Sequence, residues 1–212
     1  MSLHANAAPG AASPVSKLKS RAGGVGVVIW GAGTLFSITV LMVNHFVAMP
    51  SPSDYDLLVG GVRVMQREER VPLLLHVIYA NCSCTNGLFR HLLARRALPG
   101  FQERILFVGI DAERRRGAEA QGFEFEEIDR AELAKRFGIE AAPLFMVYDH
   151  QELGYVGGYY ETPATVHPRD QEILPRVLAG ETVEPLPLYG CAVSPDLQRA
   201  LDPLGIKYPS GG

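Results

Sequence analysis

The feature that most constrains how this chain folds is an apolar run that ends in two closely spaced cysteines. Residues 71–80 read Val-Pro-Leu-Leu-Leu-His-Val-Ile-Tyr-Ala, and Cys82 and Cys84 follow with a single serine between them. A short apolar run bounded by a change of pattern is typical of a buried strand. After the cysteines, apolar residues recur at helical spacing over residues 88–97 and predict a helix. The cysteines therefore lie at a strand-to-helix junction, where the positive end of a helix dipole stabilises a thiolate.

Length, charge and cysteine usage bound the class of protein. The 212 residues are enough for one domain of ordinary size with appendages. Three cysteines, of which the third is Cys191, cannot form a framework of several disulfides. A net charge of -3 with only short basic clusters gives no reason to expect nucleic acid as a partner. The cysteine pair therefore indicates reactive thiols or metal ligands rather than structural staples.

The N-terminal part of the chain predicts a membrane anchor. Residues 1–23 are rich in Ala, Ser, Pro and Gly and are expected to be a disordered cytoplasmic tail. The predicted transmembrane helix, residues 24–49, is long enough to cross roughly 30 Å of hydrocarbon. Three basic residues precede it: Lys17, Lys19 and Arg21. The positive-inside rule then places the rest of the chain in the periplasm.

We therefore expect a single-pass protein of the inner (cytoplasmic) membrane that contacts the lipid bilayer through residues 24–49. A cleaved signal peptide is the alternative, although the apolar run is longer than the core of a typical signal peptide. Either location permits disulfides.

The remaining chain predicts alternating strands and helices between two flanking segments. Residues 50–70 are expected to be a linker and a helix capped by Ser53 and Asp54, and residues 181–212 a proline-rich C-terminal extension with a short helix from Ser194. Strands are expected at 71–80, 104–110, 144–148 and 155–160, and helices after the cysteines, at 129–137 and at 169–178. The charged stretch 111–127 is expected to be a loop with a short helical turn.

This order of elements resembles the thioredoxin-like superfamily. Two segments carry the resemblance: Ile78-Tyr-Ala-Asn-Cys82 is similar to the family's strand before its active-site cysteines, and Phe137–Gly158 is similar to its proline and hairpin segment. The resemblance implies that Pro143 follows a cis peptide bond and faces the cysteines. It assigns residues 71–180 to a thioredoxin-like domain, and the predicted anchor is similar to that of membrane-tethered relatives in bacterial envelopes. The expected fold class is α/β, a thioredoxin-like mixed sheet flanked by helices and preceded by one transmembrane helix.

The cysteine site departs from the Cys-x-x-Cys pattern of that family, because Thr85 stands where the second cysteine would be. The resemblance nevertheless implies a thiol–disulfide oxidoreductase that acts on protein thiols and disulfides and exchanges electrons with a redox partner. Cys82 is favoured as the attacking thiol and Cys84 as the resolving one, with Pro143 orienting the mixed disulfide. Cys191 is either a third, resolving or regulatory thiol or a packed cysteine of the C-terminal extension.

Two alternatives to the oxidoreductase remain open. Two thiolates with a histidine nearby suit a soft ion, so Cys82, Cys84 and His91 are candidate ligands for Cu(I) in a copper-handling protein. His91 is otherwise a surface residue of the predicted helix. The other alternative is a non-catalytic envelope scaffold in which Cys82 and Cys84 form a structural bridge. No other metal or cofactor is expected.

Overall fold

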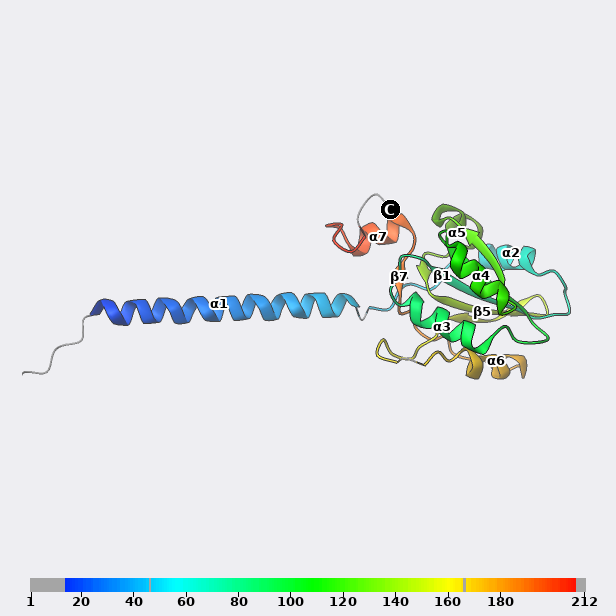
Figure 1. Cartoon of the computed structure of the whole chain (residues 1–212), viewed down its shortest axis with the longest axis horizontal. Coiled ribbons are helices and arrows are strands. Elements are labelled where there is room, and N and C mark those ends of the chain that lie inside the picture. The colour runs from blue at the N-terminus through cyan, green and yellow to red at the C-terminus, as the bar shows by residue number, and fades with distance from the viewer. Residues whose placement is uncertain (1–13, 46, 166, 209–212) are drawn as a thin grey trace, which may run out of the picture. The chain divides into compact units, whose positions relative to one another are not determined.

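The computed structural model describes residues 14–45, 47–165 and 167–208, apart from the side chains of residues 14–23 and 40–45. The chain divides into two units, Met1–Val47 and Ala48–Gly212. Figure 1 shows one long helix in the first unit and a sheet with its helices in the second. The second unit carries all three cysteines.

The first unit contains α1 (Pro14–His45). The helix begins at Pro14, and proline is tolerated in the first turn of a helix. Residues 14–23 are therefore helical, and the predicted disorder is wrong for them. Residues 1–13 lie outside the described residues. Among the helices that the structure describes, none combines the length and apolar character required to cross a bilayer. The structure thus does not support the transmembrane helix predicted over residues 24–49.

The structure differs from the predicted span at its C-terminal end. The α1 helix ends at His45, and Met49 belongs to the second unit. Its side chain is buried in the core of that unit, and its backbone N–H donates to the carbonyl of Leu188 at 2.7 Å. The apolar character of Met49 therefore reflects burial in a protein core.

The second unit is built on a five-stranded mixed sheet in the order β3-β2-β1-β5-β6. Strands β1, β2 and β3 are parallel, and β5 runs antiparallel to both β1 and β6. Their bounds are β1 Leu73–Tyr79, β2 Gln102–Val108, β3 Glu124–Ile128, β5 Leu144–Asp149 and β6 Glu152–Gly157. A separate two-stranded sheet pairs β4 (Ala141–Ala142) with β7 (Cys191–Ala192). The mixed α/β architecture expected from the sequence is confirmed; β3 of the main sheet and both strands of the small sheet are not among the predicted strands.

Six helices of the second unit are described. They are α2 (Tyr55–Met65), α3 (Thr85–Arg95), α4 (Ala112–Ala120), α5 (Arg130–Phe137), α6 (Asp170–Leu178) and α7 (Pro195–Leu201). Asp129 caps α5 by accepting a hydrogen bond from the N–H of Glu132, and Ser194 caps α7 by accepting one from the N–H of Leu197. The α2 helix is capped by Asp54, one of the two predicted caps, and ends at Met65.

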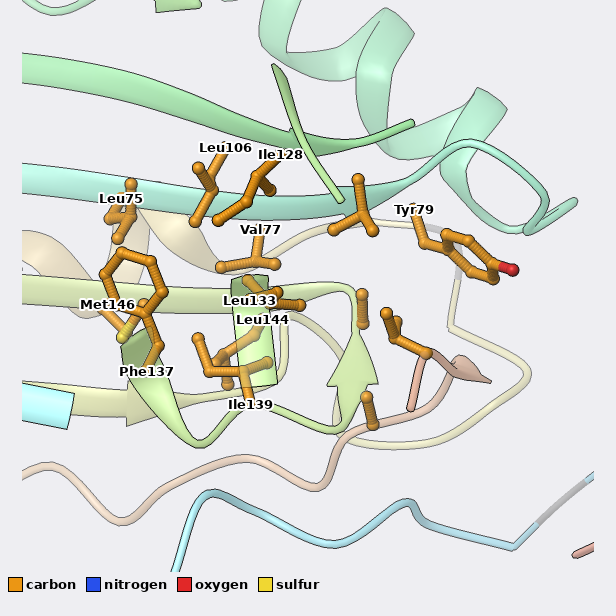
Figure 2. Packing of buried hydrophobic residues seen from close by; sticks show 14 of the residues in the cluster. Leu75, Val77, Tyr79, Leu106, Ile128, Leu133, Phe137, Ile139, Leu144 and Met146 are labelled. Carbon is orange, nitrogen blue, oxygen red and sulfur yellow. The ribbon is translucent and has the colours of Figure 1, made fainter. Parts of the chain in front are cut away.

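The two faces of the sheet form two cores because successive side chains of a strand point to opposite sides. Figure 2 shows the first core, in which Leu75 and Val77 of β1 pack with Phe137 of α5. Helix α2 buries residues of its own in this core. On the opposite face, Leu74 and Ile78 pack with the apolar sides of α3 and α6. Burial on both faces explains why β1 is a continuous apolar run.

The prediction of a loop over residues 111–127 is wrong. The segment contains α4, capped by Asp111, and the edge strand β3. Three of the five residues of β3 are glutamates, and Arg104 of β2 pairs with two of them, Glu124 and Glu126. A charged edge strand protects a sheet from pairing with other chains, but its sequence lacks the apolar signal of a strand.

The C-terminal extension packs against the rest of the second unit. Leu188 and Val193 are buried, and the N–H of Val193 donates to the carbonyl of Glu140 at 2.7 Å. Strand β7 of this extension pairs with β4, so that Cys191 lies opposite Ala142. The extension thus brings a third cysteine close to the central sheet.

Candidate functional site

The loop that carries the cysteines is held between the end of β1 and the first turn of α3. The N–H of Cys82 donates to the carbonyl of Tyr79 at 3.2 Å, and the carbonyl of Cys82 accepts from the N–H of Thr85 at 3.1 Å. The hydroxyl of Thr85, which is fully buried, also donates to the Tyr79 carbonyl, at 2.8 Å. Thr85, which stands where the second cysteine of a Cys-x-x-Cys pattern would be, therefore anchors the helix to the strand.

Cys82 and Cys84 are joined by a disulfide, with their Cα atoms 5.4 Å apart. The two residues differ in access, because Cys82 is only 2% exposed whereas Cys84 is half-buried. Cys84 is also the residue directly before α3 and makes no side-chain capping hydrogen bond. A thiolate at this position lies near the positive end of the helix dipole, which stabilises it. Cys84 is thus the more accessible sulfur of the pair.

The third cysteine joins the same site. The Sγ atoms of Cys82, Cys84 and Cys191 all lie within 4.8 Å of one another. Cys191 is a free, half-buried thiol on β7, paired with Ala142, and the Ala142–Pro143 peptide bond is cis as the resemblance implies. The structure therefore brings together both predicted cysteines, the predicted proline segment and the cysteine of the C-terminal extension.

The position of Cys191 depends on a close approach between two backbone segments. A Cβ atom added at Gly190 would lie 2.0 Å from the carbonyl oxygen of Ala142 and 2.6 Å from Cδ of Pro143. No residue with a side chain fits there without a shift of β7. On the other side of β7, the hydroxyl of Tyr208 accepts a hydrogen bond from the N–H of Ala192 at 3.0 Å. Both contacts hold Cys191 over the disulfide.

The surroundings of Cys191 influence its charge. Burial raises the pKa of the Cys191 thiol, whereas the Lys207 ammonium and a hydrogen bond with Tyr208 act to lower it. The net direction is upward, so at neutral pH the thiol form of Cys191 is favoured. Lys207 and Tyr208 are the groups on this side of the site that favour the thiolate.

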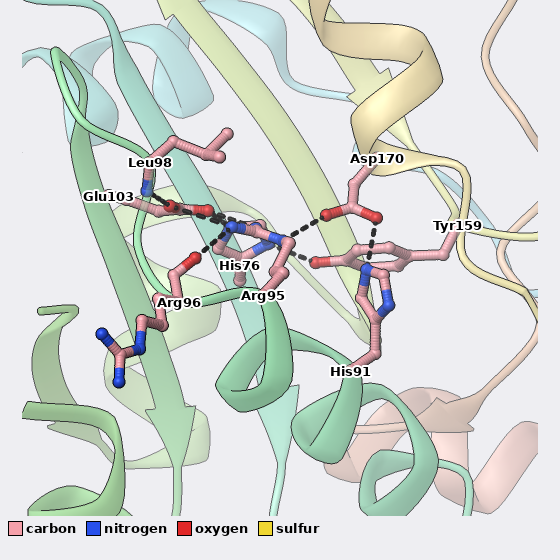
Figure 3. A network of polar contacts seen from close by, with 8 residues as sticks. All are labelled: His76, His91, Arg95, Arg96, Leu98, Glu103, Tyr159 and Asp170. Atoms are coloured by element: carbon pink, nitrogen blue, oxygen red, sulfur yellow. Dashed lines mark hydrogen bonds and ion pairs between the residues drawn. The ribbon is translucent and has the colours of Figure 1, made fainter. Parts of the chain in front are cut away.

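His91, the histidine of the predicted copper site, takes part in a different interaction. Its Nε2 atom lies 2.8 Å from Oδ1 of Asp170, a buried residue of α6. Figure 3 shows His91 directed toward Asp170, which also pairs with Arg95. Among the residues that the structure describes, the group able to hold a metal ion consists of the three cysteines alone. The combination of Cys82, Cys84 and His91 is not brought together.

Asp170 also belongs to a buried polar cluster that the sequence does not predict (Figure 3). The buried ring of His76 lies between the hydroxyl of Tyr159, 2.6 Å from Nδ1, and the carboxylate of Glu103, 2.7 Å from Nε2. Arg95 forms a close ion pair with Glu103 and contacts Asp170 at 2.9 Å. Although burial raises the pKa of Glu103, the hydrogen bonds and charges of His76 and Arg95 lower it to about 2. The cluster joins β1, β2, α3 and α6.

The only signal of this cluster in the sequence is the single histidine inside the apolar run of residues 71–80. A buried polar residue requires a partner, since an unpaired polar group in a core costs roughly 1–3 kcal/mol. Its partner Glu103 lies 27 positions away in the sequence. No local pattern connects the two residues.

A cleft lies beside the cysteine loop. Its volume is about 590 Å³, and it opens at the carboxyl ends of the three parallel strands, at Tyr79, Val108 and Ile128. Asn81, the neighbour of Cys82 in the chain, and Ile110, which is 87% exposed, also line it. The cleft thus combines apolar surface with proximity to the disulfide.

The comparisons with known proteins assign no family. No family model matches the chain, and no curated protein matches it. Among solved structures, it is similar to a hypothetical protein from Sinorhizobium meliloti 1021, with 24% identity, a TM-score of 0.47 and coverage of 59% of this chain and 80% of that one. It is also similar to an uncharacterized conserved protein from Geobacillus kaustophilus, with 21% identity, a TM-score of 0.46 and coverage of 59% and 77%. Neither similarity carries a functional argument.

Proposed function

We propose that the protein is a thioredoxin-like thiol–disulfide oxidoreductase that acts on protein thiols through Cys82 and Cys84. The observation that carries this proposal is the Cys82–Cys84 bridge at the junction of β1 and α3, with one sulfur buried and the other half-buried. A disulfide with an accessible sulfur at a helix N-terminus is able to undergo exchange, because the helix dipole stabilises the thiolate that leaves or attacks there.

Support for the thioredoxin-like assignment comes from the order and placement of the elements. A parallel strand leads into the cysteine loop, and α3 follows it directly. Pro143 follows a cis peptide bond and immediately precedes β5, which pairs antiparallel with β1. Gly190 and Cys191 connect this proline segment to the cysteines. Both segments that carry the resemblance therefore meet at one site.

The difference in burial suggests the order of steps. A client thiolate attacks Sγ of Cys84, the half-buried sulfur; a client–Cys84 disulfide forms, the Cys82–Cys84 bond breaks, and Cys82 leaves as a thiolate that takes up a proton. A second client thiolate then attacks the client sulfur of this mixed disulfide and releases Cys84. One disulfide has been transferred to the client, and the protein is left with two thiols. The reverse sequence reduces a client. This order differs from the sequence expectation, which favoured Cys82 as the attacking thiol.

The cleft at Asn81 and Ile110 provides a surface for a client beside the bridge. The same reasoning favours a compartment that permits disulfides, so an extracytoplasmic location is part of the proposal. The proposed exchange reaction does not depend on whether α1 crosses a membrane. The electrons are exchanged with a redox partner of the dithiol or disulfide class.

Trapping of mixed disulfides tests the proposal. We expect the full-length Cys82→Ser protein, which retains Cys84, to form a long-lived mixed disulfide with an unfolded client that carries a disulfide, because the Cys84 thiolate attacks that disulfide, one client thiol is released and no Cys82 thiol resolves the adduct. The Cys84→Ser protein should form far less. Each variant carries Cys191→Ser as well, so that the third thiol does not resolve the adduct. Mass spectrometry of the alkylated adducts identifies the sulfur involved.

A redox titration of the wild-type protein completes the test. We expect the Cys82–Cys84 bridge to be reduced by a physiological dithiol at a measurable potential. If no physiological dithiol reduces the bridge and neither variant traps a client, the proposal is wrong and the structural bridge of a scaffold is the better description.

A further inference from the structure

We propose that, once the Cys82–Cys84 bridge is reduced, Cys82, Cys84 and Cys191 form a three-thiolate site for Cu(I). The starting observation is that the three sulfur atoms lie within 4.8 Å of one another although they come from segments far apart in the chain. The site uses the cysteine of the C-terminal extension in place of His91, the third candidate ligand in the copper alternative of the sequence analysis.

The spacing of the sulfurs suits a single metal ion. Metal–thiolate bonds are about 2.3 Å long, so three sulfurs placed symmetrically around one ion lie about 4 Å apart. The Cys191 sulfur lies within 4.8 Å of the other two, at most about 1 Å beyond this spacing, whereas the Cys82 and Cys84 sulfurs are bonded to each other and lie closer than it. Reduction converts the bridge and two thiols of an external dithiol into two protein thiols and an external disulfide. It then allows the Cys82 and Cys84 sulfurs to separate from bonding distance toward the required spacing.

The type and number of ligands select the ion. All three donors are sulfur, and thiolates favour soft ions such as Cu(I) or ions such as zinc. Structural zinc takes four ligands in a tetrahedron, which is one more than this group of described residues supplies. Cu(I) is stable with three thiolates. The site therefore matches Cu(I) better than zinc.

The backbone holds the third ligand in place before any metal binds. Pairing of Cys191 with Ala142 fixes β7 on β4, and the absence of a side chain at Gly190 allows this close approach. Beyond Cys191, the N–H groups of Val193 and Ser194 both donate to the carbonyl of Glu140. A ligand held in this way loses little conformational freedom on binding.

Burial and charge also suit a bound ion. Cys82 is buried and the other two cysteines are half-buried, so an ion at the site is shielded and still reachable from one side. Binding of Cu(I) to three thiolates leaves a net negative charge, and the thiol protons are released. The Lys207 ammonium, which favours the Cys191 thiolate, and the N-terminus of α3 partly offset this charge.

Titration of the reduced full-length protein with Cu(I) tests the site. The protein is reduced with a phosphine under anaerobic conditions and titrated against a chromophoric Cu(I) chelator. We expect one Cu(I) per chain, coordinated by three sulfurs in X-ray absorption spectra. Cys191→Ser should lower the affinity at least about tenfold and reduce the sulfur count to two, because even loss of a residue that only supports a ligand costs 10–100-fold.

Two further variants test whether the position of Cys191 matters and whether His91 takes part in binding. Gly190→Ala keeps all three thiols but forces β7 away from Ala142, so it should weaken binding in the same direction. His91→Gln, with folding checked by circular dichroism, should bind Cu(I) as the wild type does, because His91 interacts with Asp170. Unchanged affinity in Cys191→Ser, dependence on His91, or coordination by fewer than three sulfurs in the wild type would overturn the inference. Mixed-disulfide trapping tests the proposed exchange reaction separately, so either result can fail without the other.

Discussion

Replacement of Glu103 by glutamine tests whether the buried polar cluster stabilises the second unit. Glu103 is 2% exposed and accepts hydrogen bonds from His76 and Arg95. Glutamine retains the size of the side chain but removes the negative charge. His76 then loses its anionic partner, while Arg95 keeps its ion pair with Asp170.

The magnitude follows from the pKa of Glu103. Burial alone raises this pKa, but the interactions with His76 and Arg95 lower it from its ordinary value of 4.5 to about 2. A difference of one pKa unit between the folded and unfolded states corresponds to about 1.4 kcal/mol. The charged form of Glu103 therefore contributes about 3 kcal/mol to the free energy of unfolding at neutral pH. No correction for solvent screening is needed because the side chain is buried. We expect Glu103→Gln to lower the free energy of unfolding by this amount, in line with the roughly 3–5 kcal/mol lost when one partner of a buried ion pair is removed.

The pH dependence gives a second signature. Because the pKa of Glu103 is lower in the folded state, its contribution is fully present above about pH 4.5 and is lost as the pH falls from there toward 2. The difference in stability between wild type and Glu103→Gln should therefore shrink over this range.

Urea unfolding of the full-length proteins, followed by far-ultraviolet circular dichroism, measures the difference in stability. Tryptophan fluorescence does not serve here, since the only tryptophan is Trp30 in α1. Glu172→Gln is the control, because Glu172 forms an exposed pair with Arg169 and should change stability by less than about 1 kcal/mol. A loss below about 1 kcal/mol for Glu103→Gln at pH 7, or a difference that does not vary between pH 5 and 2.5, would refute the reasoning.

Two further predictions concern the packing of α2 against α5 and the charge of Lys207 near Cys191. Gly61→Ala should destabilise the protein by roughly 1–3 kcal/mol in the same urea titration, because the added Cβ would lie 2.5 Å from the carbonyl oxygen of Arg136 in α5. Gly60→Ala is the control: its Cβ would meet nothing within 4 Å, so it should be neutral or stabilising by up to about 1 kcal/mol. Lys207→Gln should raise the pKa of Cys191, because the Lys207 ammonium acts to lower it. The pH profile of Cys191 alkylation by iodoacetamide in the oxidised protein should therefore move to higher pH. An unchanged profile would contradict this role of Lys207.

The sequence correctly predicts the elements whose signals are local. Strand β1 and the second half of β2, residues 105–108, are recognisable as apolar runs, and α5 and α7 begin at recognisable caps. Strand β3 was missed because its glutamates are stabilised by Arg104 on the neighbouring strand, a partner that no window around residues 124–128 contains. The predicted C-terminal limit of the segment over residues 24–49 fails for a similar reason, since Met49 packs in the core of the second unit with residues far from it in the sequence.

The candidate site divides in the same way. The sequence by itself determined that Cys82 and Cys84 stand at a strand-to-helix junction, because hydrophobic periodicity changes at that point in the chain. Only the tertiary structure decided that Cys191 joins them and that His91 does not, because these positions depend on the pairing of β7 with β4 and on the contact of His91 with Asp170. Pairings between residues far apart in the chain are set by the packing of the whole unit, and no local pattern of residues encodes them.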